Sequence, residues 1–458
     1  MISPRRALTV LALGALASAC AAIWGFEDGL PGGVRDGGAT DAPNDGALLE
    51  GRAPDCRTLT ASDMEGIFVS RAQGTADAAC GTRAAPCKTV QLGLDRARAT
   101  PGKTQVYVAR GAYMESITLH GGVSVVGGFN LDWSRACSEP SGSVVQIQAV
   151  DKAITVTAED LDTPALLSDL GVLSKPAGPG ESLFGVVARG TGTRLGLTDV
   201  VIRVSAGGAG VRGPSGDAGA PGAASCPPED GGPGLAVDAS GNGGEGGAFV
   251  REGFVSAAGA RGDPGNPGRN GAPGADGGCV TCHTCGGTVV CGSLSSADAC
   301  GAAGASGCGG GGGLGGGGGG GGGSSVALYV WDAQVNLARS ALSAGGGGNG
   351  ALGGGGGPGA QGGTGARGNA TTTCFTACGG VLGSCGSAPA SAEGGAGTSG
   401  GTGAPGARGG AGGGGFSYAL YTNNSDKVKT DDRTTLTHGE PGLSEGNGST
   451  GRSADRGP

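Results

Sequence analysis

The sequence predicts an all-β protein built as a parallel β-helix that carries glycine-rich insertions. The first observation is a series of short β-type runs, Val106–Ala109, Ser116–Leu119 and Val123–Val126, separated only by Gly-containing turns. The gaps are too short for helical crossovers, so these runs suit successive faces of one coil. The second observation is glycine at every third position through five long stretches.

Composition limits both the core and the partners. Glycine accounts for 109 of 458 residues and aromatic residues for only 3%, so an ordinary thick core cannot form, and repetition or disorder is expected. The formal net charge is −8, with 30 basic and 38 acidic residues dispersed along the chain. No basic stripe is present, which argues against a nucleic-acid partner.

Residues 1–20 have the pattern of a secretion signal. Arg5 and Arg6 precede the apolar stretch Ala7–Leu16, and small residues then lead into Cys20. This arrangement resembles a bacterial lipoprotein signal, although Ala17 stands where Leu is usual. The resemblance implies that Cys20 is acylated and begins the mature chain.

The residues around Cys20 bear on the destination. Ala21 beside the Cys resembles the version of the signal that is exported to the outer membrane. The alternative is an ordinary signal peptide, cleaved after Ala19 or Ala22. Residues 21–54 are rich in Gly, Asp, Ala and Pro and are expected to form a flexible tether. No later segment approaches about 18 continuous apolar residues, so no transmembrane helix is expected.

The folded part is expected to begin near Asp55, with a β-helix over residues 55–206. Ile67–Val69 gives a first strand, and Thr89–Ala99 has helical apolar spacing that would cover the open end of the first coil. Further coil segments are predicted at Val144–Gln148, Ala153–Val156, Leu170–Leu173, Phe184–Val187, Leu195–Leu197 and Val200–Val204.

The start of this region resembles the pectin-lyase-like superfamily. There, an amphipathic helix precedes the pattern V-x-V-x-x-G-x-Y-x-E-x-I. The resemblance implies a right-handed parallel β-helix and invites comparison with polysaccharide lyases and glycosidases. The pattern is carried here by Val106, Val108, Gly111, Tyr113, Glu115 and Ile117.

The triplet glycine runs divide the second half of the chain. We expect a Cys-containing insertion at 207–324, a coil at 325–344, a second insertion at 345–415, a last coil at 416–438 and a disordered tail at 439–458. The runs are Gly207–Gly222, Gly259–Gly277, Gly301–Gly322, Gly347–Gly368 and Gly394–Gly415.

A three-residue period indicates polyproline-II-type helices with one face made of glycine. Without Cβ atoms on that face, neighbouring helices can approach closely enough to pair their backbone groups. This resembles the polyglycine-II bundles of some antifreeze proteins and phage tail fibres. Flexible disorder is an alternative, because ordering glycine costs much entropy. A collagen-like helix is another, although Pro is scarce in the runs.

Fifteen cysteines suit an oxidising compartment, since fourteen remain to pair after Cys20. Spacing favours Cys80–Cys87 with Cys56–Cys137 but leaves three connectivities open for this group. The disulfide candidates are Cys56, Cys80, Cys87, Cys137, Cys226, Cys279, Cys282, Cys285, Cys291, Cys300, Cys308, Cys374, Cys378 and Cys385.

One cysteine cluster has several interpretations. Cys279-Val-Thr-Cys282-His283 satisfies the pattern of c-type haem attachment, and zinc binding is also compatible. Cys285 follows at once and other cysteines lie close, so a disulfide knot is favoured. We therefore predict no cofactor and no metal.

A catalytic site would lie on the outer face of the coils. The alternation in Val200–Val204 turns Asp199 and Arg203 outward, with Asp160 and Asp162 as further carboxylates. Asp199 and Arg203 are weak candidates, because strand geometry separates them by about 13 Å. Convergence of several carboxylates and an Arg would favour a carbohydrate-active enzyme.

The chain thus resembles the glycine-rich, PGRS-like β-helix lipoproteins of bacteria. This predicts a non-enzymatic outer-membrane lipoprotein, facing the cell surface or the periplasm, or a secreted protein if it is not lipidated. Its role would be structural or adhesive. Its expected partners are the membrane, through the lipid anchor, and a polysaccharide or other surface ligand. The rival hypothesis is a carbohydrate-active β-helix enzyme.

Overall fold

The computed structural model describes residues 60–136, 144–229, 231–237, 239–277, 279–280, 299–370 and 393–458. The chain divides after Arg52, and the fold below is that of the unit Ala53–Pro458. The proposed signal, Cys20 and the tether lie outside the described residues, as do Cys56 and Cys137.

This unit is mostly β, and nearly all of its strand pairs are parallel. The elements are β1 Gly66–Val69, α1 Val90–Ala99, β2 Gln105–Ala109, β3 Gly111–Met114, β4 Ile117–Thr118, β5 Ser124–Phe129, β6 Val145–Gln148, β7 Ile154–Glu159, β8 Ala165–Leu173, β9 Leu183–Arg189, β10 Arg194–Val204, β11 Ala248–Val250, β12 Gly253–Val255, β13 Cys279–Val280, β14 Ala299–Cys300, β15 Ser325–Trp331, β16 Gln334–Ala338, β17 Ala341–Ala344, β18 Ser417–Thr422, η1 Ser425–Lys427, β19 Val428–Thr430, β20 Thr435–Thr437 and β21 Ser453–Arg456.

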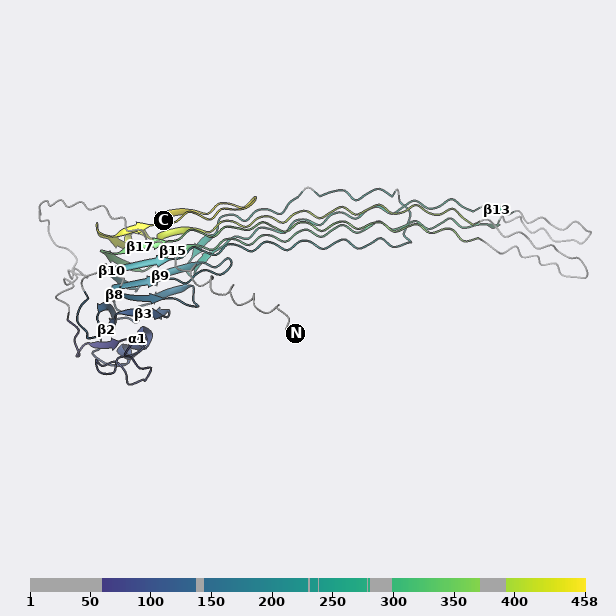
Figure 1. Ribbon diagram of the computed structural model, residues 1–458. Coiled ribbons are helices and arrows are strands. Elements are labelled where there is room, and N and C mark those ends of the chain that lie inside the picture. The colour runs from purple at the N-terminus through teal and green to yellow at the C-terminus, as the bar shows by residue number, and fades with distance from the viewer. Residues whose placement is uncertain are drawn as a thin grey trace, which may run out of the picture. The chain divides into compact units, whose positions relative to one another are not determined.

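Two parallel sheets share the core (Figure 1). One has eleven strands, and its main path runs β1-β2-β5-β8-β10-β16-β19. The other has six strands, in the order β21-β18-β15-β9-β7-β4. From β7 onward the chain visits the two sheets in turn, apart from the small hairpins β11–β12 and β13–β14. Each visit adds one strand, or the two successive strands β16 and β17 or β19 and β20, in parallel register beside the strand of the previous visit. Alternate apolar residues, such as Val200 and Ile202, are fully buried between the sheets.

Helix α1 covers the first strands, as expected. Thr89 is its N-cap, with the hydroxyl oxygen accepting from the Leu92 N–H at 3.2 Å. The Glu115 carboxylate accepts from the N–H groups of Val90 and Gln91, at 2.7 and 3.0 Å. Glu115 therefore accepts from two of the N–H groups at the start of the helix that have no partner within the helix.

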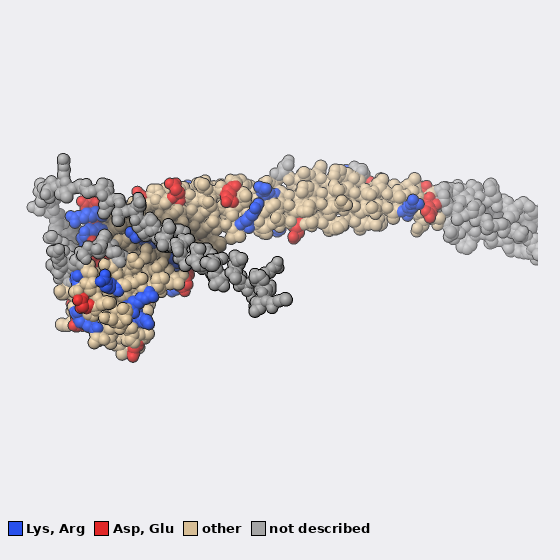
Figure 2. All heavy atoms as spheres, in the orientation of Figure 1, with Lys and Arg blue, Asp and Glu red and all other residues tan. Residues whose placement is uncertain are grey.

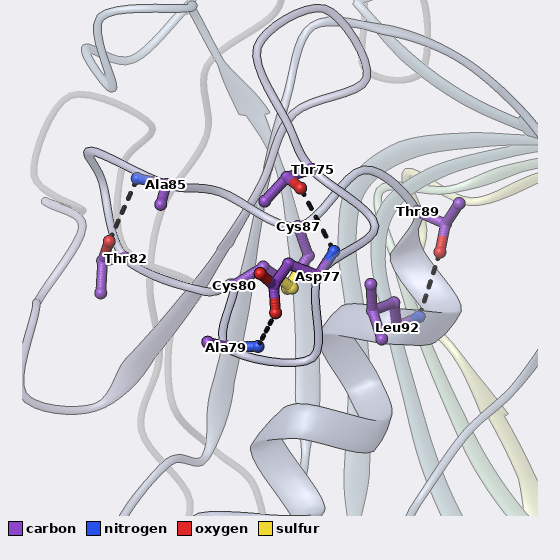
Figure 3. The surroundings of a disulfide bond; sticks show 9 residues. All are labelled: Thr75, Asp77, Ala79, Cys80, Thr82, Ala85, Cys87, Thr89 and Leu92. Atoms are coloured by element: carbon purple, nitrogen blue, oxygen red, sulfur yellow. Dashed lines mark hydrogen bonds between the residues drawn. A yellow bond between two sulfur atoms is a disulfide. The ribbon is translucent and has the colours of Figure 1, made fainter.

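The remaining positions of the predicted pattern also have structural roles. Val106 and Val108 are fully buried in the core. The Tyr113 hydroxyl donates to the Ala109 carbonyl at 2.8 Å, and burial raises the pKa of Tyr113 to about 12. Figure 3 shows the Cys80–Cys87 disulfide, the pairing favoured above, near the start of α1.

The glycine-rich segments run beside one another as extended rods that leave and re-enter the strands (Figure 1). We number the rods in chain order: rod 1 is 207–222, rod 2 is 231–244, rod 3 is 257–277, rod 4 is 301–323, rod 5 is 345–368, rod 6 is 394–415 and rod 7 is 439–445. Rods 1, 5 and 7 follow β10, β17 and β20, while rods 4 and 6 lead directly into β15 and β18.

The expectation of a disordered tail at 439–458 is wrong. Rod 7 runs along rod 5, and β21 then pairs in parallel with β18. Ala454 packs against the aromatic cluster of the six-stranded sheet. Backbone hydrogen bonds and glycine contacts hold most of this segment in place. It therefore folds without the strong apolar pattern from which order is predicted in a sequence.

Candidate functional site

The glycine bundle is built from hydrogen bonds that recur every three residues. Along rod 4, the N–H groups of Gly310, Gly313 and Gly316 donate to carbonyls of rod 6, each at 2.9 Å. Rod 3 repeats the pattern toward rod 4, and rod 6 repeats it toward rod 5. Regular pairing of this kind satisfies amides that a glycine-rich coil would leave to water.

Rod 4 pairs with four neighbours, rods 1, 3, 5 and 6. Its successive glycines face different rods. A Cβ on Gly315 would lie 1.8 Å from a carbonyl of rod 3, and one on Gly316 would lie 2.1 Å from a carbonyl of rod 5. One on Gly317 would lie 2.7 Å from Pro214 of rod 1. The column of rod 4 that faces rod 1 is the most open, because Leu314, one turn before Gly317, is accommodated there and is 42% exposed.

A disulfide joins two rods of the bundle. Cys226, just beyond rod 1, bonds Cys308 of rod 4, with their Cα atoms 5.0 Å apart. Both belong to the predicted set of disulfide candidates. Cys279 and Cys300 lie opposite each other in the β13–β14 pair. The candidates Cys282, Cys285, Cys291, Cys374, Cys378 and Cys385 lie outside the described residues, and so does His283.

Charge is sparse along the bundle. Figure 2 shows Lys, Arg, Asp and Glu gathered around the β-sheets, with only scattered charged side chains over the described length of the rods. Rod 4 has no ionisable residue other than cysteine and rod 5 has only Arg367, whereas rod 1 carries two charged residues and rod 3 carries four. The surface therefore consists mainly of backbone and small neutral side chains.

The hairpin formed by β11 and β12 ties rods 2 and 3 to the six-stranded sheet. The Phe249 ring lies 3.9 Å from that of Tyr421, and the Tyr329 hydroxyl donates to the Val250 carbonyl. A cavity of about 280 Å³ opens beside the hairpin, lined by Gly180, Ser182, Phe184, Val250, Glu252, Gly253, Phe254, Val255 and Ser256. Glu252 is the only ionisable group in that lining, so the cavity offers no acid–base pair.

Of the two weak catalytic candidates, Asp199 lies at a bend and is bound by a residue outside the predicted set. Asp199 has a left-handed backbone (φ 53°), which bends β10 and places Asp199 and Arg203 on segments of different direction. Asp199 instead accepts from Arg339, with Nε–Oδ1 and Nη2–Oδ2 distances of 3.0 and 2.5 Å. Arg339 was not predicted from the sequence.

Arg339 is the centre of a ladder of bend residues. Asp169, Asp199 and Arg339 occupy matching register positions in neighbouring segments of the eleven-stranded sheet, and all three have φ between 48° and 56°. Hydrogen bonding to Asp199 raises the pKa of Arg339, and the charges of Asp431 and Asp169 add to this effect. Asp431 accepts from the Arg339 backbone N–H at 3.0 Å.

This ladder uses its charged groups internally. Asp169 forms an ion pair with Arg135 at 3.0 Å, and both oxygens of Asp199 accept from Arg339. Asp160 pairs with Arg251 at 3.2 Å, while Asp162 is exposed. In the described part of the chain, no group of three His, Cys, Asp or Glu residues could hold a metal ion. We therefore interpret the ladder as a set of ion pairs and hydrogen bonds that stabilises the bends.

The chain matches no protein-family model, no curated protein and no solved structure. Among the described residues, no helix is long and apolar enough to cross a membrane.

Proposed function

We propose that this chain is a secreted, lipid-anchored surface protein with a structural or adhesive role. In this proposal the two sheets are faces of a right-handed parallel β-helix, and the rods form a polyglycine-II bundle held out from it. The alternating visits to two parallel sheets support the first part. The three-residue hydrogen-bond period supports the second, because polyproline-II-type helices have three residues per turn.

The observation that carries the proposal is the packing of rod 4. Three consecutive residues, Gly315 to Gly317, each meet a different rod at a distance that no side chain could occupy. Folding pays a high entropic cost to order glycine, so an ordered bundle of this length points to a function in the bundle itself. Its sparse charge suits contact with neutral, hydroxyl-rich surfaces such as polysaccharides.

The anchoring part of the proposal rests on the residues around Cys20 and on the Gly- and Asp-rich segment that follows. An acyl chain at Cys20 would hold the protein at the outer membrane, and residues 21–54 would act as a spacer. The glycine-rich, PGRS-like lipoproteins remain the family that the chain resembles in style.

One structural feature favours the rival hypothesis, a carbohydrate-active enzyme. Arg339 does lie among the carboxylates of Asp169, Asp199 and Asp431. A hydrolase or lyase, however, needs a carboxylate free to act on the substrate as acid, base or cation ligand. Asp199 is fully engaged by Arg339, and Asp431 by Thr434 and the backbone. We therefore favour the non-catalytic role.

Cell fractionation and adhesion assays test the proposal. Cells producing the Cys20→Ala chain should release it from the membrane fraction, whereas the parent chain should stay with the outer membrane. Cells displaying the parent should adhere to polysaccharide-coated surfaces better than cells with Gly316→Val, whose bundle is disrupted. Gly355→Ala is the matched control, because a Cβ there meets nothing within 4 Å. Membrane retention of Cys20→Ala, or equal adhesion of all variants, would refute the respective part.

A further inference from the structure

The C-terminal segment docks on only part of the groove between rods 5 and 6. The N–H groups of Gly347 and Gly350 on rod 5 donate to the carbonyls of Glu440 and Leu443 on rod 7, at 2.9 and 2.8 Å. The chain then turns near Asn447 and returns along rod 6, where the Gly414 N–H donates to the Ser449 carbonyl at 2.8 Å. This hairpin, residues 439–452, covers the first part of the groove.

Beyond the hairpin, the same column of rod 5 has no backbone partner in the part of the chain that the structure describes. Gly356, Gly359, Gly362 and Gly365 follow Gly347 and Gly350 in the three-residue phase. Within the described residues, neither the N–H nor the C=O of these four glycines has a hydrogen-bond partner, and all four are partly exposed. They repeat over about 28 Å, at 3.1 Å per residue.

This edge is the counterpart of an unpaired strand at the side of a β-sheet. A row of free N–H and C=O groups at fixed spacing is a template for another chain. The side chains beside it on rod 5, from Leu352 through Gly355 and Pro358 to Gln361, carry no charge. On rod 6 the neighbouring column contains Thr402 and Arg408, both exposed.

The occupant of the groove must itself be rich in glycine. Where the hairpin fills the groove, a Cβ on Gly442 would lie 1.9 Å from the Gly348 carbonyl. One on Gly451 would lie 1.9 Å from the Gly415 carbonyl. An ordinary peptide, with side chains at those positions, cannot lie so close. Only a segment with glycine in triplet phase fits.

We propose that the open part of this groove binds rod 5 of a second copy of this chain. The interface continues the one that the hairpin already makes with rods 5 and 6. Pairing two identical edges lets each copy supply the acceptors and donors that the other lacks, as a two-fold interface requires. The arrangement goes beyond surface anchoring, because it makes the bundle a self-associating element.

The test is the oligomeric state of the Cys20→Ala chain, which carries no lipid. Sedimentation should find a dimer, and Gly355→Glu and Thr402→Glu should each raise the dissociation constant at least about ten-fold, because each puts an unpaired charge into the groove. Ser215→Glu is the control. It lies on rod 1 at the same height, since the Gly216 N–H donates to the Gly355 carbonyl. It should leave the dimer intact.

Hydrogen exchange gives a second, independent measurement. The amides of Gly356, Gly359 and Gly362 should become protected as the protein concentration rises, while the thermal midpoint of Gly355→Glu stays that of the parent. A chain that is monomeric at every concentration, or a control variant that weakens the dimer equally, would overturn the proposal. A monomer that binds a synthetic Gly-Gly-Ala repeat peptide would overturn the second-copy assignment and point to a different glycine-rich partner.

Discussion

The carboxylate of Asp199 and the guanidinium of Arg339 form a two-pronged ion pair between neighbouring segments of the eleven-stranded sheet, although the two residues are 140 positions apart in the chain. Both have left-handed backbones, so the pair fixes the two bends against each other. Because both side chains are partly exposed, at 22% and 31%, solvent reduces the strength of the pair.

A double-mutant cycle with Asp199→Asn and Arg339→Asn should give a coupling energy of about 1 kcal/mol, measured by urea unfolding. Asn tolerates the left-handed backbone at both positions, so the cycle isolates the ion pair. Added salt should lower the coupling. Strictly additive effects of the two substitutions would show that the pair contributes nothing.

Neighbouring glycines of rod 5 should respond in opposite ways to the same substitution. A Cβ on Gly356 would lie 1.8 Å from the Gly406 carbonyl, whereas one on Gly355 meets nothing. Gly356→Ala should therefore lower the free energy of unfolding by about 1–3 kcal/mol or more. Gly355→Ala should be neutral or stabilising by up to about 1 kcal/mol. Equal thermal midpoints for the two variants would contradict the packing of rods 5 and 6.

Asp431 should make stability depend on pH. Burial raises the pKa of this carboxyl, but hydrogen bonds from the Thr434 hydroxyl and from backbone N–H groups outweigh burial and leave the pKa lowered. Its stabilising effect is therefore present above the unfolded value of 3.8 and lost as the pH falls through the folded value. Denaturation of the parent and of Asp431→Asn should differ at pH 7 and converge in acid. A gap that persists in acid would rule this out.

The Cys226–Cys308 bond closes a long loop, with a sequence separation of 82. On a chain-entropy estimate, replacing both residues with Ser should cost about 4.5 kcal/mol of stability. Limited proteolysis should then cut rods 1 to 4 faster. The double variant Cys80→Ser with Cys87→Ser is the contrast, because that bond closes a separation of only 7 and its loss should cost less stability. Peptide mapping that finds Cys226 and Cys308 unlinked would remove the basis of this prediction.

Local sequence signals predicted much of the β part. The apolar runs placed the strands within a few residues, and the helical spacing over Thr89–Ala99 placed α1. Sequence spacing also favoured the Cys80–Cys87 bond, because a short loop constrains its own ends. The structural role of Glu115 could not be read from spacing, since its partners lie on the preceding helix.

The contacts between distant segments were not predictable in the same way. Asp199 and Arg339 are 140 residues apart in the chain, and only the pairing of β10 with β16 and β17 brings them together. Rod 2 was not predicted from the sequence, because its glycines do not keep a continuous three-residue phase. Gly234 and Gly241 are seven residues apart, yet they bond Thr402 and Arg408, which are six apart. The triplet pattern also says nothing about which rods become neighbours.

The direct entry of rods 4 and 6 into β15 and β18 has a mechanical consequence. A pull along the bundle would load the hydrogen bonds between rods in shear, so that the force is shared by a whole column of bonds at once. The load would then pass without a joint into strands in the interior of the six-stranded sheet. Such a projection resists extension along its length while it yields to bending across it.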